Sequence, residues 1–211
     1  VAAAANPNSA RVEGSAAAAT DGAPAGNLGW GTRLRQILLT GVSYMIPFVA
    51  AGGLMIALGF LLAGYDIANT PDGASASLAN TIATTNSLTN LPGGGLAQYL
   101  GAVLFTLGGL AFGFLVPALA GYIAYAIADR PGLAPGFTAG AVAVFVGAGF
   151  IGGIVGGLIA GFAALWISRW SVPQWFRGLM PVVVIPLLAS LVVGLLMFLL
   201  LGRPLAAITS G

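Results

Sequence analysis

Few residues of this chain could carry chemistry, and the acidic and basic pair Asp129-Arg130 is the most suggestive. The sequence contains no His and no Cys, which excludes zinc sites, imidazole or thiol nucleophiles and phosphohistidine or phosphocysteine carriers. It also shows no paired carboxylates, no glycine-rich nucleotide loop and no catalytic triad. We therefore expect no catalytic residue, no metal and no cofactor in this chain.

Asp129-Arg130 ends a long apolar block and precedes two Pro-Gly pairs, Pro131-Gly132 and Pro135-Gly136. A guanidinium can hold phosphate by charge-assisted hydrogen bonds, so one interpretation places the pair at the cytoplasmic mouth of a substrate path. The alternative is an interfacial ion pair that only stops the preceding span. The Pro-Gly pairs predict turns that a continuous helix would not hold.

The elements that must position this pair have the composition of a membrane protein. Of 211 residues, 58% are hydrophobic, 6% are charged and 33 are glycines, unlike the composition of soluble domains. The net charge is +2 and Lys is absent, which excludes the basic patch that nucleic-acid binding needs. We predict an all-α, polytopic membrane protein with kinked, Gly-rich helices in a lipid bilayer and no nucleic-acid partner.

Residues 1–31 are rich in Ala, Gly, Pro and Ser and hold almost no large apolar side chain. They cannot bury enough surface to offset their chain entropy, which predicts a disordered Ala-rich linker followed by a membrane domain at 32–211. A secretory signal is the competing interpretation, but no suitable apolar run occurs before Leu34. Because the first residue is Val, we expect further sequence before this linker.

The first uncharged block, residues 37–65, predicts a membrane span. It is long enough for about 40 Å of helix, which exceeds the roughly 30 Å hydrocarbon core. Pro47 and Gly52-Gly53 inside it predict a kink that neighbouring helices must support. The polar stretch 66–95 predicts an extramembrane loop with one short amphipathic helix around 75–84.

Later uncharged blocks predict further membrane segments. Residues 96–128 are long enough for about 50 Å of helix, so we expect strong tilt or a break at Gly108-Gly109 or Pro117. Residues 178–202 predict another span.

Arginine positions predict the orientation, because short cytoplasmic loops collect arginine. Arg33 and Arg35 precede the first span, whereas the 66–95 loop carries only acidic charges. We therefore expect a cytoplasmic N-terminus and an external loop. Arg130 and Arg169 share the cytoplasmic side if residues 137–168 form a hairpin.

The hairpin would consist of two short segments that turn near Gly147-Ala148-Gly149. About 32 residues are tight for two full spans and suit two half-depth segments, which would make the hairpin re-entrant. The alternative is a single crossing that leaves Arg169 and Arg177 outside.

Glycines recur every fourth residue at Gly149, Gly153, Gly157 and Gly161. In lipid such a face lets two helix backbones approach closely. It predicts either a specific helix–helix or subunit contact, or simple space filling in a crowded bundle.

Three stretches together resemble a known family. They are GVSYMIPFVAAGGLMIALGF at 41–60, GFLVPALAGYIAYAIADRPGLAPGF at 113–137, and GAGFIGGIVGGLIAGF with MPVVVIPLLASLVVGLLM between 147 and 197. From about Leu34 to its end the chain is similar to enzyme IIC, the membrane permease of the bacterial phosphoenolpyruvate-dependent fructose phosphotransferase system. The resemblance implies a multi-pass protein of the bacterial plasma (inner) membrane that carries a sugar, expected to be fructose.

The resemblance also implies the partners. A phosphocysteine domain, enzyme IIB, would phosphorylate the sugar with phosphate from upstream phosphotransferase proteins, and a second copy would complete a homodimer. Residues 1–31 resemble the joint between IIB and IIC domains. Complete permeases of this kind continue with further spans, so the resemblance covers the N-terminal part, which in related permeases chiefly forms the dimer interface.

The resemblance implies that the chain is one part of a protein-phosphohistidine-sugar phosphotransferase, with the phosphoryl carriers on other domains. The alternative is a non-catalytic membrane subunit or a secondary transporter, which the Gly-rich composition and the lack of catalytic groups would also fit.

The arginine positions lead to a topology prediction. Cysteines introduced singly as Ser75→Cys and Arg169→Cys should react with an impermeant thiol reagent from opposite sides, Ser75→Cys from outside and Arg169→Cys from the cytoplasm. The Cys-free parent is the control for background labelling. Labelling of both positions from the same side would rule out the hairpin.

Overall fold

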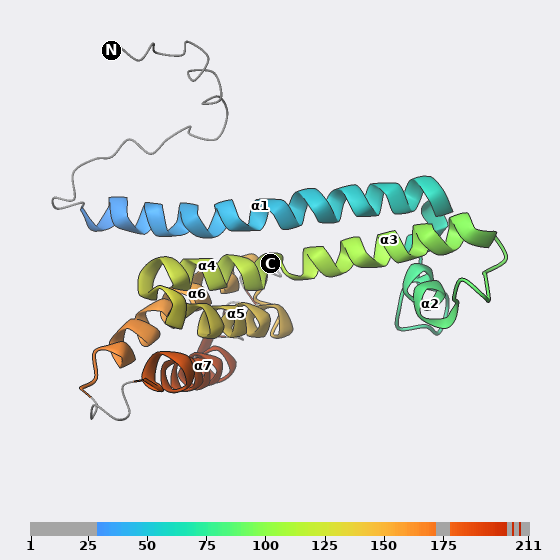
Figure 1. Ribbon diagram of the computed structural model, residues 1–211. Helices are drawn as coiled ribbons and strands as arrows, with labels where there is room; N and C mark the ends of the chain where they lie inside the picture. Colours follow the sequence, from blue (N-terminus) through green and yellow to red (C-terminus); the bar gives the residue numbers. More distant parts are fainter. Residues whose placement is uncertain (1–28, 172–177, 202–203, 205–206, 208–211) are drawn as a thin grey trace, which may run out of the picture.

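The computed structural model describes residues 29–171, 178–201, 204 and 207 (Figure 1). Within these residues the chain is helical, with a short 3-10 turn at Tyr65–Ala68 and π-helical turns at Met180–Val184 and Met197–Leu201. The α-helices are α1 (Trp30–Ala63), α2 (Leu78–Thr85), α3 (Gly95–Gly113), α4 (Leu115–Ala128), α5 (Arg130–Phe145), α6 (Gly149–Ser168) and α7 (Ile185–Leu196). The predicted linker 1–31 lies outside the described residues except for its last three positions, and α1 already begins at Trp30.

Four segments in the described ranges are long and apolar enough to cross a membrane. They are Trp30–Ala63, Gly95–Ala128, Gly149–Ser168 and Met180–Leu199. These findings confirm the predicted all-α, multi-pass membrane protein. The short helix expected around 75–84 is also confirmed as α2, which Ser77 caps by accepting a hydrogen bond from the Asn80 N–H.

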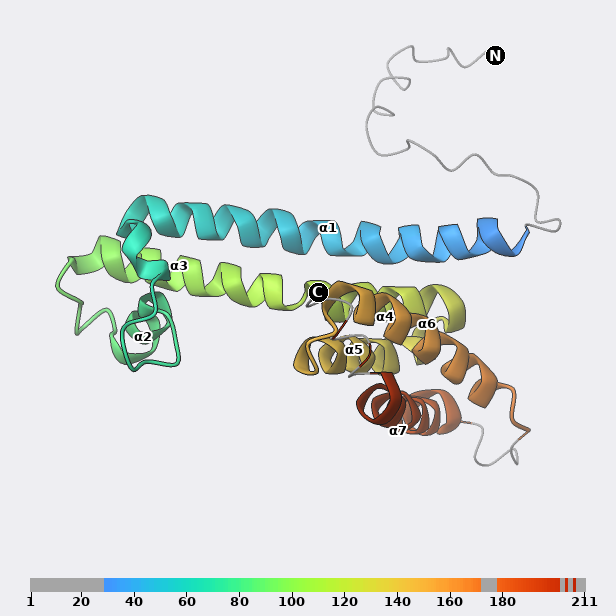
Figure 2. The ribbon, with the colours of Figure 1, turned by 180° about the vertical axis from the view of Figure 1, so that it is seen from behind.

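α1 runs along the whole length of the molecule and connects its two parts (Figures 1 and 2). At one end it lies beside α3, with α2 tucked against α3. At the other end α4, α5, α6 and α7 gather below the first half of α1. α1 continues through Pro47 without a break, and its 34 residues correspond to about 51 Å.

Glycines hold α1 against α3. A Cβ atom built on Gly59 would lie 2.8 Å from the Gly101 carbonyl oxygen, and one on Gly101 would lie 2.9 Å from the Gly59 carbonyl oxygen. Further along the same two helices, Gly52 and Gly108 meet in the same way. A Cβ built on Gly52 would lie 3.1 Å from the Gly108 carbonyl oxygen, and one on Gly108 would lie 2.7 Å from the Gly52 carbonyl oxygen. The two backbones are therefore in direct contact at both positions.

The predicted long block 96–128 is broken into two helices, which confirms one of the two expectations, but the break lies at neither predicted position. α3 ends at Gly113 and α4 starts at Leu115, with Phe114 between them. Pro117 explains this position, because it has no N–H to donate to the carbonyl four residues earlier, which is that of Gly113. The alternative break at Gly108-Gly109 is wrong, since both glycines lie inside α3 and Gly108 is needed against α1.

The turns predicted from the two Pro-Gly pairs are wrong, because both pairs lie inside α5. Pro131 occupies the first turn, where a missing N–H costs nothing. Gly132 and Gly136 let α5 lie on the backbone of α4: a Cβ on them would be 2.5 and 2.7 Å from the carbonyl oxygens of Ala124 and Ala120. Close packing of the two helices therefore overrides the local turn preference.

α5 and α6 form the predicted hairpin, and they are joined through Val146, Gly147 and Ala148, where the turn was expected. The first arm is longer than predicted, because α5 begins at Arg130 rather than at residue 137, whereas the second arm ends at Ser168 as expected. At 20 residues, α6 alone is long enough to cross the membrane.

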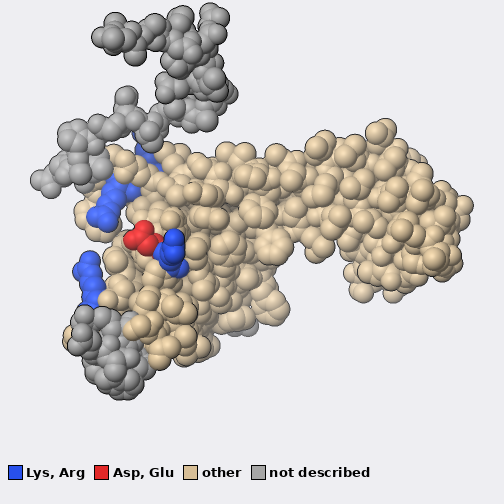
Figure 3. Space-filling model, viewed as in Figure 1, with Lys and Arg blue, Asp and Glu red and all other residues tan. Residues whose placement is uncertain are grey.

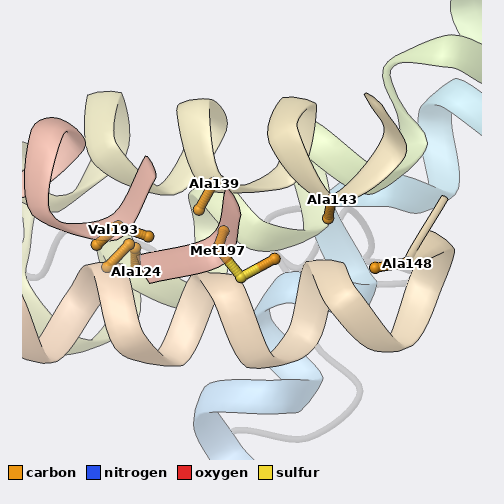
Figure 4. Packing of buried hydrophobic residues seen from close by; sticks show 7 residues of the cluster. Ala124, Ala139, Ala143, Ala148, Val193 and Met197 are labelled. Carbon is orange, nitrogen blue, oxygen red and sulfur yellow. The ribbon is translucent and has the colours of Figure 1, made fainter. Parts of the chain in front are cut away.

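The core between α4, α5, α6 and α7 is made mostly of alanine (Figure 4). Ala124, Ala139 and Ala143 are fully buried there. Val193 of α7 and Met197 of the π-helical turn that follows it are buried against them. Such small side chains allow the helix axes to approach closely, which is the usual arrangement where lipid offers no hydrophobic driving force.

The α1–α3 contact leads to a stability prediction. Gly59→Ala should destabilise the protein by roughly 1–3 kcal/mol, because its Cβ would overlap the backbone of α3. Gly53→Ala is the matched control on the same helix, with nothing within 4 Å of its Cβ, and should be neutral or stabilising by up to about 1 kcal/mol. Unfolding in mixed detergent micelles, followed by circular dichroism, measures both. Equal stabilities of the two variants would contradict the backbone contact.

Candidate functional site

Most of the charged side chains among the described residues gather at one end of the molecule. Figure 3 shows the arginine and acidic side chains in view at the end where α1 begins. Arg33 lines one cavity together with Asp129 and another together with Arg169. The start of α1, the α4–α5 junction and the end of α6 therefore meet here, and we call this the arginine end.

The α4–α5 junction is held in an unusual backbone conformation. Asp129 has φ 55° and ψ −147° and is the only non-glycine residue with positive φ in the described ranges. Its N–H donates to the Tyr125 carbonyl (2.8 Å), and its own carbonyl accepts from the Gly132 N–H (3.0 Å). This region of backbone space is essentially reserved for glycine and costs other residues about 1–3 kcal/mol. Such outliers concentrate at functional sites, which makes Asp129 a candidate on structural grounds.

A cavity of about 350 Å³ lies between α1 and α4 beside this junction. Its volume lies in the range typical of small-molecule sites, and because five of its lining residues have polar or charged side chains, we call it the polar cavity. Its polar lining side chains are Arg33, Gln36 and Thr40 from α1 and Tyr125 and Asp129 from the α4 end.

The polar cavity offers hydrogen-bond donors and acceptors of several kinds. A guanidinium, an amide, two hydroxyls and a carboxylate can together bind a polyhydroxylated or phosphorylated small molecule. Thr40 Oγ1 already donates to the Gln36 carbonyl oxygen at 2.9 Å. Its lone pairs remain available to accept from a ligand.

Aromatic stacking fixes the two walls of the polar cavity relative to one another. The rings of Tyr44 on α1 and Tyr122 on α4 are stacked, with centroids 3.9 Å apart and an angle of 3°. Tyr122 also meets Tyr125 and Phe137 edge to face, each at 6.2 Å. α1, α4 and α5 are thus joined by one aromatic cluster close to the cavity.

The structure brings only part of the predicted site together. Asp129 lines the polar cavity, whereas Arg130 is exposed at the first position of α5 and is not among the lining residues. Sequence reasoning assigned Arg33 only to topology and did not identify Gln36, Thr40 or Tyr125. The spacing of Arg33, Gln36 and Thr40 by three and four residues could have shown a polar stripe on the first span.

Three of the four glycines proposed for helix packing face α4. A Cβ on Gly157 would lie 2.7 Å from the Ala120 carbonyl oxygen, and one on Gly161 would meet Ile127 and the Ala124 Cα. Gly153 meets only the Val116 side chain closely, at 2.6 Å. Gly149 starts α6 with φ 51° and has nothing within 4 Å of a built Cβ, so its role is conformational.

The strained junction leads to a second stability prediction. Asp129→Gly should stabilise the protein by about 1 kcal/mol, since it removes a strain of about 1–3 kcal/mol and adds a smaller unfolded-state entropy cost. Asp129→Ala should give no such gain because alanine also disfavours this conformation. Asp72→Gly is the control, an exposed aspartate without positive φ, and should be neutral or slightly destabilising. Loss of stability in Asp129→Gly, measured by detergent unfolding, would contradict the strain.

Comparison with known proteins identifies relatives over most of the chain. No family model and no solved structure matches it. It is 50% identical over 175 residues to the "PTS system fructose-specific EIIB'BC component" of Escherichia coli K12, covering 82% of this chain and 26% of that protein. It is 38% identical over 197 residues to the "PTS system fructose-specific EIIC component" of Haloferax volcanii, covering 85% of this chain and 47% of that protein.

A third relative, the "Fructose-like permease IIC component 2" of Escherichia coli K12, is 32% identical over 176 residues, or 83% of this chain and 42% of the relative. The chain thus spans between about a quarter and a half of the length of these relatives. The resemblance first seen in three sequence stretches therefore extends along more than four fifths of the chain. The chain belongs to the enzyme IIC family of fructose phosphotransferase membrane components.

Proposed function

We propose that this chain is a membrane component of a fructose phosphotransferase transporter, in which sugar crosses the membrane as a IIB domain phosphorylates it. The 50% identity to a fructose-specific EIIB'BC component carries this proposal. The name of that relative, EIIB'BC, gives IIB and IIC parts in one protein, which supports a IIB partner. Several relatives are named as fructose-specific, which supports fructose as the sugar. A homodimer in the bacterial inner membrane is the assembly that the family resemblance favours.

The proposed orientation places the arginine end in the cytoplasm. Arg33, Arg35, Arg130 and Arg169 belong to this end, whereas Asp66 and Asp72 follow α1 at the opposite end. Arginine excess on one side favours the cytoplasmic side. The linker at 1–31 would then join the membrane domain at 32–211 from the compartment in which a IIB domain works.

Within this orientation, the polar cavity is the proposed passage for sugar or sugar phosphate at the cytoplasmic mouth. The Asp129 carboxylate would accept hydrogen bonds from sugar hydroxyls, and Arg33 would attract the phosphate. Arg130, at the exposed start of α5, would guide the phosphate between the IIB domain and the cavity. In the transfer itself a bond forms between phosphorus and a sugar hydroxyl oxygen, and the phosphorus–sulfur bond of the IIB cysteine breaks to release a thiolate. The hydroxyl proton would pass to this thiolate or to water. This chain would position and attract the reactants.

Vesicles that carry the intact transporter containing this chain test the proposal. With phosphorylated IIB and labelled fructose, sugar phosphate should accumulate on the IIB side. Arg130→Gln should lower this rate about tenfold or more, as expected for loss of a charge-assisted hydrogen bond, and Arg130→Lys should lower it less. Arg35→Gln is the control, because Arg35 is an exposed arginine of α1 that lines neither cavity.

The alternatives give different results in the same vesicles. Unmodified fructose accumulating with an ion gradient would identify a secondary transporter and refute the phosphotransferase proposal. Rates are normalised to correctly inserted protein, because loss of a charge at the membrane boundary also affects insertion. A normal rate per inserted Arg130→Gln molecule would leave Arg130 with only the role of an interfacial stop charge.

A further inference from the structure

A second cavity at the arginine end has a different chemical character. Its volume is about 470 Å³, and it lies between the first turns of α1 and the last turns of α6. Two arginines, Arg33 and Arg169, contribute its charge, and none of its described lining residues is acidic. The remaining lining residues are aliphatic or aromatic, among them Trp30, Ile37, Phe162 and Trp166. We call it the apolar cavity.

The aromatic side chains of the apolar cavity form an open wall. The Trp30 and Phe162 rings lie with their centroids 6.3 Å apart and connect the start of α1 to α6. Trp30 is 76% exposed and Trp166 is 65% exposed, whereas Ile37 at the cavity floor is 8% exposed. Exposed tryptophans next to arginines at the end of membrane-spanning helices are typical of the lipid headgroup level.

We propose that the apolar cavity binds one anionic phospholipid. Its phosphate would lie between the Arg33 and Arg169 guanidinium groups, and its acyl chains would lie against Trp30, Phe162 and Trp166. The described lining of this cavity has two arginines and no carboxylate, and Asp129 faces Arg33 only from the polar cavity. Such a positive lining selects for negative charge, and basic pockets between membrane helices are known to bind anionic headgroups. This proposal is independent of the transport function.

The lining favours a lipid phosphate over a free phosphate or a sugar phosphate. A soluble ligand needs hydrogen-bonding groups for its hydroxyls, and the polar cavity supplies them from Gln36, Thr40, Tyr125 and Asp129. Among the described residues that line the apolar cavity, the two arginines are the only charged ones, and most of the lining is hydrocarbon. A ligand with a charged head and long apolar chains matches both features at once.

Quenching of tryptophan fluorescence by brominated lipids tests the proposal, because Trp30 and Trp166 lie in the site itself. The full chain, with Trp170→Phe and Trp175→Phe to remove other signals, is reconstituted into phosphatidylcholine vesicles. Dibrominated phosphatidylglycerol or dibrominated phosphatidylcholine is then added in increasing mole fraction. Phosphatidylglycerol should reach half-maximal quenching at a mole fraction at least about fivefold lower than phosphatidylcholine.

Arginine variants separate a built site from general surface charge. Arg33→Gln and Arg169→Gln should each reduce the preference for phosphatidylglycerol about fivefold, the value expected for one arginine at an anionic surface. Arg35→Gln is the matched control, since it removes the same charge two residues from Arg33 but outside the cavity. Each single variant is informative by itself, so a variant that lacks both Arg33 and Arg169 is not needed.

Three outcomes would overturn the proposal. Equal quenching by the two lipids would show that the cavity has no preference for anionic headgroups. Equal losses in Arg35→Gln and Arg33→Gln would show that surface charge alone attracts the lipid. Relief of quenching by millimolar inorganic phosphate or glycerol phosphate would identify a site for free phosphate, whereas a lipid site should keep its quenching under these conditions.

Discussion

The structure depends on direct contact between helix backbones, which glycine permits because it has no Cβ atom. In a bilayer, a large apolar side chain gains little when it leaves lipid for protein, so helices are held by close packing of backbone and small side chains. α1 meets α3 through Gly52 and Gly59, and α4 is covered by Gly132 and Gly136 on α5 and by Gly157 on α6. Ala120 and Ala124 of α4 each contact one or more glycines of α5 and one glycine of α6. α4 is therefore the central helix of the bundle.

The position of the polar cavity follows from this packing. Because α5 and α6 both lie on the backbone of α4, the end of α4 is fixed, and with it Tyr125 and Asp129. α1 reaches the same place because Gly41 allows it to lie against Leu119 and Ile123. The positive φ of Asp129 is consistent with this view, because the chain must turn from α4 into α5 within one residue while both helices remain in contact.

Properties that depend on local composition could be predicted from the sequence. The spans, the short polar helix α2 and the turn at Gly147 follow from hydropathy and from glycine content, which need no knowledge of neighbours. The helical conformation of Pro131-Gly132 and Pro135-Gly136 could not be predicted, because it depends on Ala120 and Ala124 of another helix. The break predicted at Pro117 lies three residues earlier, at Phe114, because the N–H that Pro117 lacks would have donated to the carbonyl of Gly113.

The candidate site was predictable only in part, for the same reason. Asp129 stood out because it interrupts an apolar block, but its partners Arg33, Gln36 and Thr40 are about ninety residues away in the sequence. No pattern in a single sequence shows that α1 and α4 place these residues side by side. The backbone conformation of Asp129 is likewise imposed by the packing of α4 and α5, and aspartate by itself does not predict it.

Arg33 connects the two cavities, because it is the charged residue that both have in their lining. A guanidinium carries a single positive charge, and two anions at different edges of it repel one another. An anionic headgroup in the apolar cavity would compete for this charge with a phosphate in the polar cavity, and by linkage each ligand would weaken the other to the same degree. The bilayer composition would then influence the proposed transport site through one side chain, without a change in the fold.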